Sequence, residues 1–205
     1  MYGFSREELE VLRGLDTPWK IQEFLSRLRY NPEDTCMSPR MVLRKRRCHC
    51  IEGAMLAAAA FRLSGRRPLL VDMTASRHDL DHVIAVFREN GKWGAISKTN
   101  HAVLRYREPV YSSIRELVMS FFHEYTDDKG RKTLRSYSDP LDISKLDENG
   151  WMTSENDVWA VPNTLIKTRH HAVIGLIGIR RLRRADPIEI KIGNVLQYRV
   201  RKRRP

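Results

Sequence analysis

An alanine-rich apolar run after Cys50 places the strongest single constraint on how this chain folds. From Met55 to Leu63 the sequence reads Met-Leu-Ala-Ala-Ala-Ala-Phe-Arg-Leu, and Ser64-Gly65 follows directly. Ala, Leu, Met and Arg favour helix, and a glycine just past the last periodic residue is a common stop. The run therefore predicts a helix from about Cys50 to Leu63. Its small side chains favour close packing against neighbours, as in a central helix.

Cys50 lies at the first turn of this predicted helix, directly after the basic segment 44–47. The free N–H groups and the positive dipole end of a helix favour an anion, and a thiolate is an anion. A cysteine in such surroundings has reason to ionise below its usual range. The competing interpretation is a small buried thiol, because free cysteine is among the most buried residue types.

The composition is that of a folded, strongly basic protein. Of 205 residues, 41% are hydrophobic and the formal net charge is +12, which suits one well-cored domain or a domain with an appendage. Three cysteines, an odd number, argue against a disulfide framework and for a reducing compartment, so we expect a cytoplasmic protein. We expect no membrane span, because the chain has no long uncharged apolar stretch and its N-terminus has no signal-peptide core.

The positive charge is concentrated in two places. One basic cluster covers residues 40–47, and the other runs from Arg180 into the Arg-rich tail at 199–204. A basic tail binds nucleic acid or another anionic partner without sequence specificity, or it serves only as a solvated end. Because no interleaved aromatics or known binding module accompany it, the sequence favours the solvated end.

Local signals predict an α+β protein in which the central helix packs on an antiparallel sheet. Asn-Gly between two apolar runs is a strong hairpin signal. We expect a core domain in residues 1–125 and a loop-rich basic C-terminal extension in residues 126–205. The predicted elements are helices at 5–13, from residue 18 and from residue 114, a short helix or turn at 39–47, and strands at 68–73, 83–87, 93–96, 103–106 and 188–200.

The turn of the predicted hairpin also determines which side chains share a face. The two-residue Asn90-Gly91 loop sets the strand register, and counting back from it places Ser97 opposite Ile84. Side chains alternate along a strand, so His82 shares that face and is a diagonal neighbour of Ser97. A thiol at a helix start, an imidazole on a strand and an oxygen beside the imidazole form the layout of a Cys–His nucleophilic site.

These segments resemble the transglutaminase-like superfamily of cysteine enzymes, which shares its core with papain-like proteases and arylamine N-acetyltransferases. In that family a nucleophilic Cys opens the central helix, and an Ala and then a Gly follow it, as Cys50, Ala54 and Gly65 do here. A His then begins a strand, and a Trp precedes the third member of the triad. His82 and Trp93 match these two positions.

The resemblance covers residues 39–100, and residues 16–120 also resemble an uncharacterised bacterial group with this core. It implies a cysteine hydrolase or acyltransferase that acts on an amide or thioester bond of a peptide or other amide substrate. In that reaction Cys50 is the nucleophile and His82 the general base. No cofactor is expected.

The chain departs from the family pattern at the third position. The family usually has an acidic residue four places after the Trp, and Ser97 stands there. A hydroxyl accepts the ring N–H but brings no charge to stabilise an imidazolium. We rank Ser97 first as the orienting group and Asn100 second, because Asn100 points to the other face unless the strand turns. Asp72 or Asp81 could supply the missing charge by another route.

Other interpretations of these residues remain. The Cys48-His49-Cys50 sequence invites a zinc site, but structural zinc needs about four ligands and adjacent residues chelate poorly, so we expect no metal. We name no partner for His49. Backbone N–H groups at the helix start are better oxyanion donors than Gln22, which we expect on an exposed helix face. The alternative function is a catalytically silent relative that serves as a binding module through its Arg-rich tail.

Overall fold

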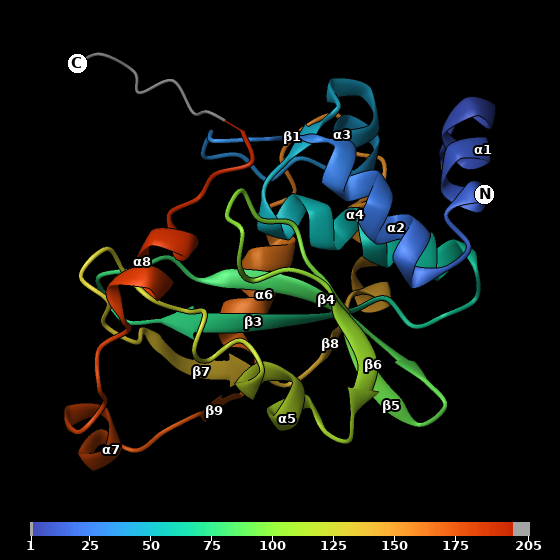
Figure 1. The fold of residues 1–205 in the computed structure, drawn as a ribbon. Coiled ribbons are helices and arrows are strands. Elements are labelled where there is room, and N and C mark those ends of the chain that lie inside the picture. The colour runs from blue at the N-terminus through green and yellow to red at the C-terminus, as the bar shows by residue number, and fades with distance from the viewer. Residues whose placement is uncertain (1, 199–205) are drawn as a thin grey trace.

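Helix α4 (Cys50–Leu63) runs through the centre of the computed structural model, which describes residues 2–198 (Figure 1). Every side chain from Ala54 to Phe61 is buried. Three N-terminal helices and strands β3 (Leu69–Ala75) and β4 (His82–Glu89) pack against it. The helix begins and ends where the alanine run predicts, and Gly65 follows it with a φ of +76°, a conformation that favours glycine.

The N-terminal helices form where their capping residues predict. Ser5 and Glu8 make a capping box at the start of the first helix, and Thr17 caps the second, whose first residue is Pro18. Ser38 caps the third. These helices are α1 (Arg6–Gly14), α2 (Pro18–Arg27) and α3 (Pro39–Lys45).

A short parallel pair of strands joins this region to the start of α4. Strand β1 (Arg29–Tyr30) pairs with β2 (Arg47–Cys48), and Tyr30 lies opposite Cys48. The pairing therefore places Tyr30 beside the residues that lead directly into Cys50.

The main sheet is antiparallel in every pairing, which confirms the mixed α+β class with a mostly antiparallel sheet. Its order is β6-β5-β4-β3-β7-β9, with β8 also paired to β3. The strands are β3 (Leu69–Ala75), β4 (His82–Glu89), β5 (Lys92–Ile96), β6 (Arg107–Tyr111), β7 (Leu134–Ser138), β8 (Leu141–Asp142) and β9 (His170–Ala172).

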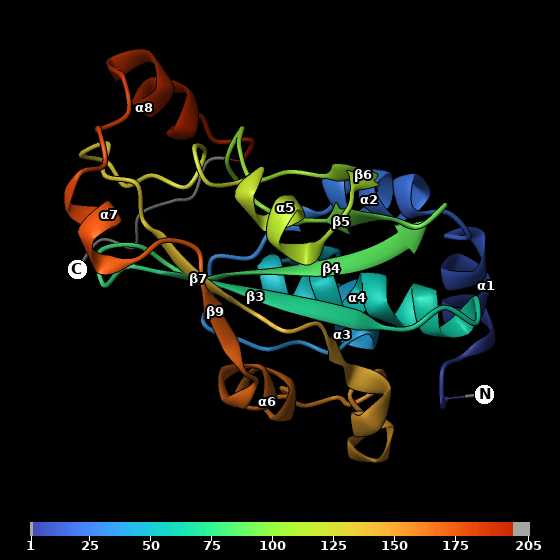
Figure 2. The same cartoon turned by 90° about the horizontal axis from the view of Figure 1, so that it is seen from below.

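The two faces of this sheet carry separate hydrophobic cores. Leu70, Ala85 and Phe87 belong to the core built around α4, whereas Val71 and Ile84 belong to the core that contains α5. This alternation is the period-two pattern of strands buried on both faces. Figure 2 shows α5 (Ile114–Met119) and α6 (Ala160–Lys167) on opposite sides of β3 and β4.

The β4–β5 hairpin has the register that its turn predicts. Glu89 pairs with Lys92, and Asn90 and Gly91 between them both have positive φ. Extending the register by one pair beyond Ala85 and Ile96 sets Ser97 opposite Ile84.

The sheet continues across the boundary expected near residue 125, because β7 pairs directly with β3. The strand expected at 103–106 lies instead at β6, after Leu104, whose φ is +59°. The strand expected at 188–200 is wrong over its first part. Asp186 and Glu189 make a capping box there, and helix α8 (Pro187–Gly193) begins. The helix-capping residues therefore decide the local structure, although apolar and polar residues alternate as in a strand.

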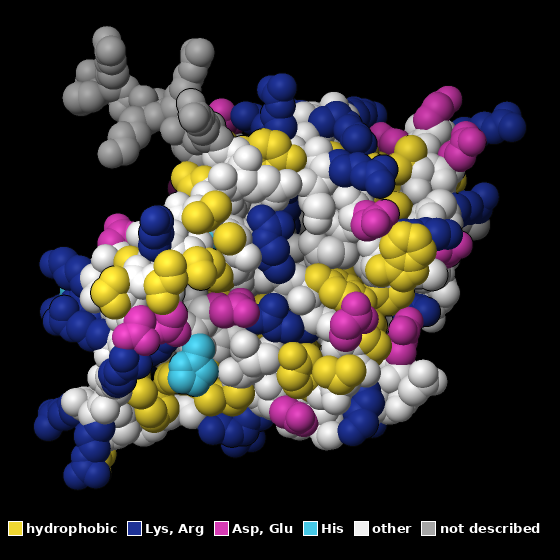
Figure 3. All heavy atoms as spheres, in the orientation of Figure 1, with side chains coloured by type: hydrophobic (Ala, Val, Ile, Leu, Met, Phe, Trp, Pro, Cys, Tyr) yellow, Lys and Arg dark blue, Asp and Glu magenta, His cyan; other side chains and the backbone are white. Residues whose placement is uncertain are grey.

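The remaining elements are the 3₁₀ helix η1 (Ile143–Asn149) and the short helix α7 (Leu176–Arg180). None of the described helices combines the length and the apolarity needed to cross a bilayer. Lys and Arg side chains are spread over the face shown in Figure 3, among acidic and hydrophobic ones. The basic tail at 199–204 lies outside the described residues.

Candidate functional site

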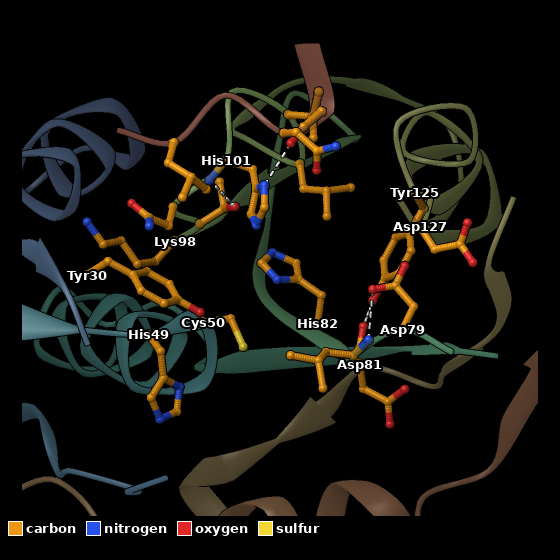
Figure 4. A pocket seen from close by; sticks show the side chains of 18 of the residues that line it. Tyr30, His49, Cys50, Asp79, Asp81, His82, Lys98, His101, Tyr125 and Asp127 are labelled. Carbon is orange, nitrogen blue, oxygen red and sulfur yellow. Dashed lines mark hydrogen bonds between the residues drawn. The ribbon is translucent and has the colours of Figure 1, made fainter. Parts of the chain in front are cut away.

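A cavity of about 770 Å³ opens at the N-terminal end of α4. Its walls come from the segment after β1, the start of α4, the β3–β4 loop, the segments after β5 and α5, and the segment after α8. Figure 4 shows Cys50, His82 and Tyr30 directed toward this space from three different elements. The cavity is therefore built where the central helix, the sheet and the loops meet.

Cys50 is the cysteine that reaches this cavity. It is half-buried, whereas Cys36 and Cys48 are fully buried in the core around α4. Burial raises the pKa of Cys36 and of Cys48 to about 12, so both remain thiols at neutral pH. Among the described residues, no group of three or more His, Cys, Asp or Glu side chains is arranged to hold a metal ion.

Two imidazoles act on the Cys50 sulfur. Burial alone would raise the pKa of Cys50, but hydrogen bonds from His49 and from His82, together with the charges of both rings, lower it to about 5. At pH 7 the sulfur is therefore a thiolate, which is the nucleophilic form.

The ring of His82 is oriented by Ser97, the residue that the sequence ranks first. His82 Nε2 lies 2.8 Å from Ser97 Oγ, and the Ser97 hydroxyl donates its own proton to the Leu104 carbonyl oxygen at 2.5 Å. A hydroxyl has one proton, so Ser97 accepts the hydrogen bond from His82 Nε2–H. This tautomer leaves Nδ1 of His82 as the nitrogen available to the sulfur.

Ser97 itself is held by Gln22 of α2. The Gln22 amide donates to the Ser97 carbonyl oxygen and accepts from the Ser97 N–H, both at 2.9 Å. Gln22 is half-buried, so the exposed position expected for it is wrong. Its side chain positions the third group of the site, and the sequence gives no local sign of a partner 75 residues away.

The segment after β5 also packs directly on the first turn of α4. A Cβ placed on Gly53 would lie 2.7 Å from the Lys98 Cβ, so only glycine permits this approach. The buried Lys98 ammonium donates to the carbonyl oxygens of Leu25 at 2.8 Å and Leu28 at 2.6 Å, at the end of α2. Ser97 is thus fixed relative to both helices.

Asn100, ranked second for orienting His82, lines the cavity but binds a different segment. Its Nδ2 donates to the Tyr198 carbonyl oxygen and its Oδ1 accepts from the Tyr198 N–H, both at 2.9 Å. Both polar atoms of the side chain are used in this pair. Asn100 therefore ties the chain after α8 to the cavity rim, and the orienting partner of His82 is Ser97.

The two carboxylates considered as sources of charge have other partners. Asp72 Oδ2 lies 3.3 Å from His170 Nε2, and Asp81 Oδ1 accepts from the Ala75 N–H at 2.7 Å. Burial raises the pKa of Asp72. The group that accepts the orienting hydrogen bond of His82 is thus a neutral hydroxyl.

His49, for which the sequence names no partner, is the residue of this site that the sequence analysis missed. Its Nε2 lies 2.7 Å from the Thr35 carbonyl oxygen and 3.4 Å from Glu52 Oε1. Burial lowers the pKa of His49, but the hydrogen bond and charge of Cys50, then Glu52, raise it to about 9. The signal that could have found it is Glu52 three residues on, which accepts the His49 N–H at 3.0 Å as in a capping box.

Comparisons with known proteins add no relative to this geometry. No family model matches the chain, and no curated protein matches it in sequence. The transglutaminase-like resemblance stays a prediction that depends on Cys50, Gly65, His82 and Trp93.

Proposed function

We propose that this protein is a cysteine-dependent hydrolase or acyltransferase of the transglutaminase-like type, acting on an amide or thioester. One observation carries the proposal. The Cys50 sulfur, at the start of a buried helix, shares a cavity with the His82 ring, which lowers the pKa of the thiol and whose far nitrogen is held by Ser97. This is the order of nucleophile, base and orienting group used by cysteine enzymes.

Before the first half of the reaction, the proton lost by the Cys50 thiol is held by His82, and the sulfur is a thiolate. The sulfur attacks the substrate carbonyl carbon, an S–C bond forms, and the carbonyl electron pair moves to oxygen. The unpaired N–H groups of the first turn of α4 are suited to this oxyanion. Tyr30 offers a second donor, because its hydroxyl ends beside Cys50 in Figure 4. His82 then protonates the leaving amine as the C–N bond breaks.

In the second half, water or an amine attacks the acyl-enzyme. His82 takes the proton of the attacking group, the S–C bond breaks, and the thiolate is restored. Water gives hydrolysis and an amine gives acyl transfer. A cavity of about 770 Å³ falls in the size range of small-molecule sites, which suits a peptide or another amide substrate.

Acyl capture by Cys50 tests this function. The protein is mixed with a peptide p-nitrophenyl ester and with a peptide thioester, quenched, and measured by intact-mass spectrometry. We expect an acyl adduct on the wild type and none on Cys50→Ser. Cys48→Ser is the matched control, because Cys48 is buried two residues away, and this variant should acylate as the wild type does.

A second variant tests the role of His82. With the activated ester, His82→Gln should still form the adduct but release it slowly to water or to an added amine, because the proton acceptor is gone. A wild-type protein that forms no adduct, or an adduct that persists in Cys50→Ser, would refute the proposal.

The binding-module alternative depends on the Arg-rich tail, which lies outside the described residues, and it stays a prediction from the sequence. It gains support if Cys50 is unreactive and nucleic-acid binding falls steeply with salt and disappears on deletion of residues 199–205.

A further inference from the structure

The two imidazoles beside Cys50 have unlike partners. His82 is backed by the neutral hydroxyl of Ser97. His49 is backed by a carboxylate, because Glu52 Oε1 lies 3.4 Å from its Nε2. A carboxylate stabilises an imidazolium, whereas a hydroxyl only orients the ring. The charged partner that His82 lacks is therefore present on the other ring.

We infer that His49 is a second catalytic residue: its imidazolium, paired with Glu52, donates a hydrogen bond to the Cys50 sulfur and holds it as a thiolate, while His82 carries protons to and from the substrate. This inference rests on the proposed function, because it assigns a role in the reaction of Cys50. It also explains how the site works without an acidic residue behind His82.

The position of Glu52 is fixed by a buried network. The carboxylate has no solvent exposure, and it accepts from the Thr35 hydroxyl at 2.6 Å, the Met37 N–H at 2.9 Å and the Asn31 amide at 3.0 Å. It also accepts the His49 N–H. A buried anion needs such donors and a cation nearby, and the His49 ring is the cation within reach.

The orientation of the His49 ring follows from its Nε2 contacts. A carbonyl oxygen only accepts, so Nε2–H donates to the Thr35 carbonyl oxygen at 2.7 Å. Nδ1 is then the nitrogen that faces the first turn of α4, where it meets the Glu52 N–H and couples to the sulfur of the next residue. With both nitrogens protonated, the ring donates to Thr35 on one side and to Cys50 on the other.

The surroundings of the sulfur make such a cation necessary. Burial opposes the thiolate, and the carboxyl group of Asp72, whose charge couples to Cys50, opposes it as well. The hydrogen bond from His49 contributes more than that from His82 to keeping the pKa of Cys50 low. Tyr30, Cys36, Cys48 and Tyr125 also couple to Cys50, but burial raises their pKa values, so they carry no charge at neutral pH.

The two rings then have separate tasks and the protons balance. His49 is protonated from solvent before the reaction, its charge is matched by Glu52, and it keeps its proton throughout. The proton that the thiol lost on ionising is held by His82 before the attack and passes from there to the leaving amine. The acyl-enzyme has no charge on sulfur, and the thiolate that departs in the second half meets the His49 N–H again.

Site-resolved alkylation across pH tests this division. Iodoacetamide labelling of Cys50 is followed by peptide mass spectrometry between pH 4.5 and 10 in the wild type, His49→Gln and His82→Gln. At pH 6 we expect His49→Gln to label at least tenfold more slowly than the wild type and to recover at pH 9, where a free thiol ionises. Recovery at high pH separates loss of charge from loss of structure. Compared with His49→Gln, we expect His82→Gln to shift the pH profile of Cys50 labelling less and to reduce turnover more.

The protonation state of His49 can also be measured in the wild-type protein, so that the test does not depend on whether His49→Gln folds correctly. In long-range ¹H–¹⁵N spectra, we expect the His49 ring to be protonated at pH 7.5, where an unperturbed imidazole is neutral, and to lose that proton at lower pH in Cys50→Ser. A neutral His49 ring at pH 7.5, or a wild-type labelling profile in His49→Gln, overturns the inference.

The outcomes separate this inference from the proposed function. If the wild type acylates on Cys50 but His49→Gln has an unchanged profile, the function stands and the role of His49 is refuted. If the wild type forms no acyl adduct at all, the proposed function fails, whatever the state of His49.

Discussion

The Ser97 hydroxyl gives its single proton to the carbonyl oxygen of Leu104 and therefore meets His82 only as an acceptor. This relationship fixes the tautomer of His82 without any charge. It also defines what the position tolerates, because the Leu104 oxygen repels any second oxygen that cannot donate. The serine is therefore not a simple substitute for the acidic residue of the transglutaminase-like enzymes that the sequence resembles.

Replacing Ser97 tests that point. Ser97→Ala removes one neutral hydrogen bond, so we expect turnover by the acyl-transfer assay to fall about tenfold. Ser97→Asp should not exceed the wild type, since its carboxylate faces the Leu104 carbonyl oxygen. A gain in turnover in Ser97→Asp would show that the position only lacks charge.

Gln22 should affect turnover through Ser97 alone. Gln22→Leu leaves the buried N–H and carbonyl oxygen of Ser97 without partners, which costs about 1–3 kcal/mol and loosens the partner of His82. We expect lower turnover with an unchanged alkylation profile for Cys50. Glu23→Ala, on the exposed side of the same helix, is the matched control and should change neither measurement.

Gly53 should not tolerate a side chain. Gly53→Ala puts a methyl group against the Lys98 Cβ, and we expect it to lower the free energy of unfolding by about 1–3 kcal/mol although alanine favours helix. Gly14→Ala is the control, because open space surrounds Gly14 and alanine there should stabilise by about 0.5–1 kcal/mol. Urea denaturation measures both, and equal effects would contradict the close approach.

The three cysteines should differ in their response to pH. Because the pKa of Cys50 is lowered to about 5, its reactive thiolate is present at neutral pH and is lost only as the pH falls through about 5. The raised pKa values of Cys36 and Cys48 keep them as thiols over the same range. We expect alkylation at pH 7 to modify Cys50 alone, and equal labelling of all three would contradict this environment.

Asn100 should affect the C-terminal segment rather than the chemistry. Asn100→Ala removes both side-chain hydrogen bonds to Tyr198, so limited proteolysis after residue 194 should become faster. The alkylation profile of Cys50 should stay that of the wild type. If the alkylation profile shifted while proteolysis stayed unchanged, Asn100 rather than Ser97 would be the group that orients His82.

What the sequence predicts correctly here depends on short-range physics. The central helix follows from side chains that favour helix, and the pairing of His82 with Ser97 follows from a two-residue turn that fixes the register of its strands. Both signals lie within a few residues of the structure that they determine.

What the sequence does not predict depends on distant partners. Asn100 meets Tyr198, which lies 98 residues away, and Gln22 meets Ser97 across 75 residues. Glu52 is a local signal for His49, but the contact of His49 with Thr35 forms only when the loop carrying Thr35 folds back over Glu52. No periodicity encodes such contacts, because they depend on how loops close over a finished core.

Lys98 spans two helices at once, with its ammonium on the last carbonyl oxygens of α2 and its Cβ against Gly53 of α4. Lys98 fits against α4 only because Gly53 has no methyl group at its Cα. In a variant with any bulkier residue at position 53, the segment after β5, which carries Ser97 and Lys98, would have to move away from α4. The His82 imidazole would lose alignment while the Cys50 sulfur stayed reactive, and under the proposed function such a protein would capture acyl groups and release them slowly.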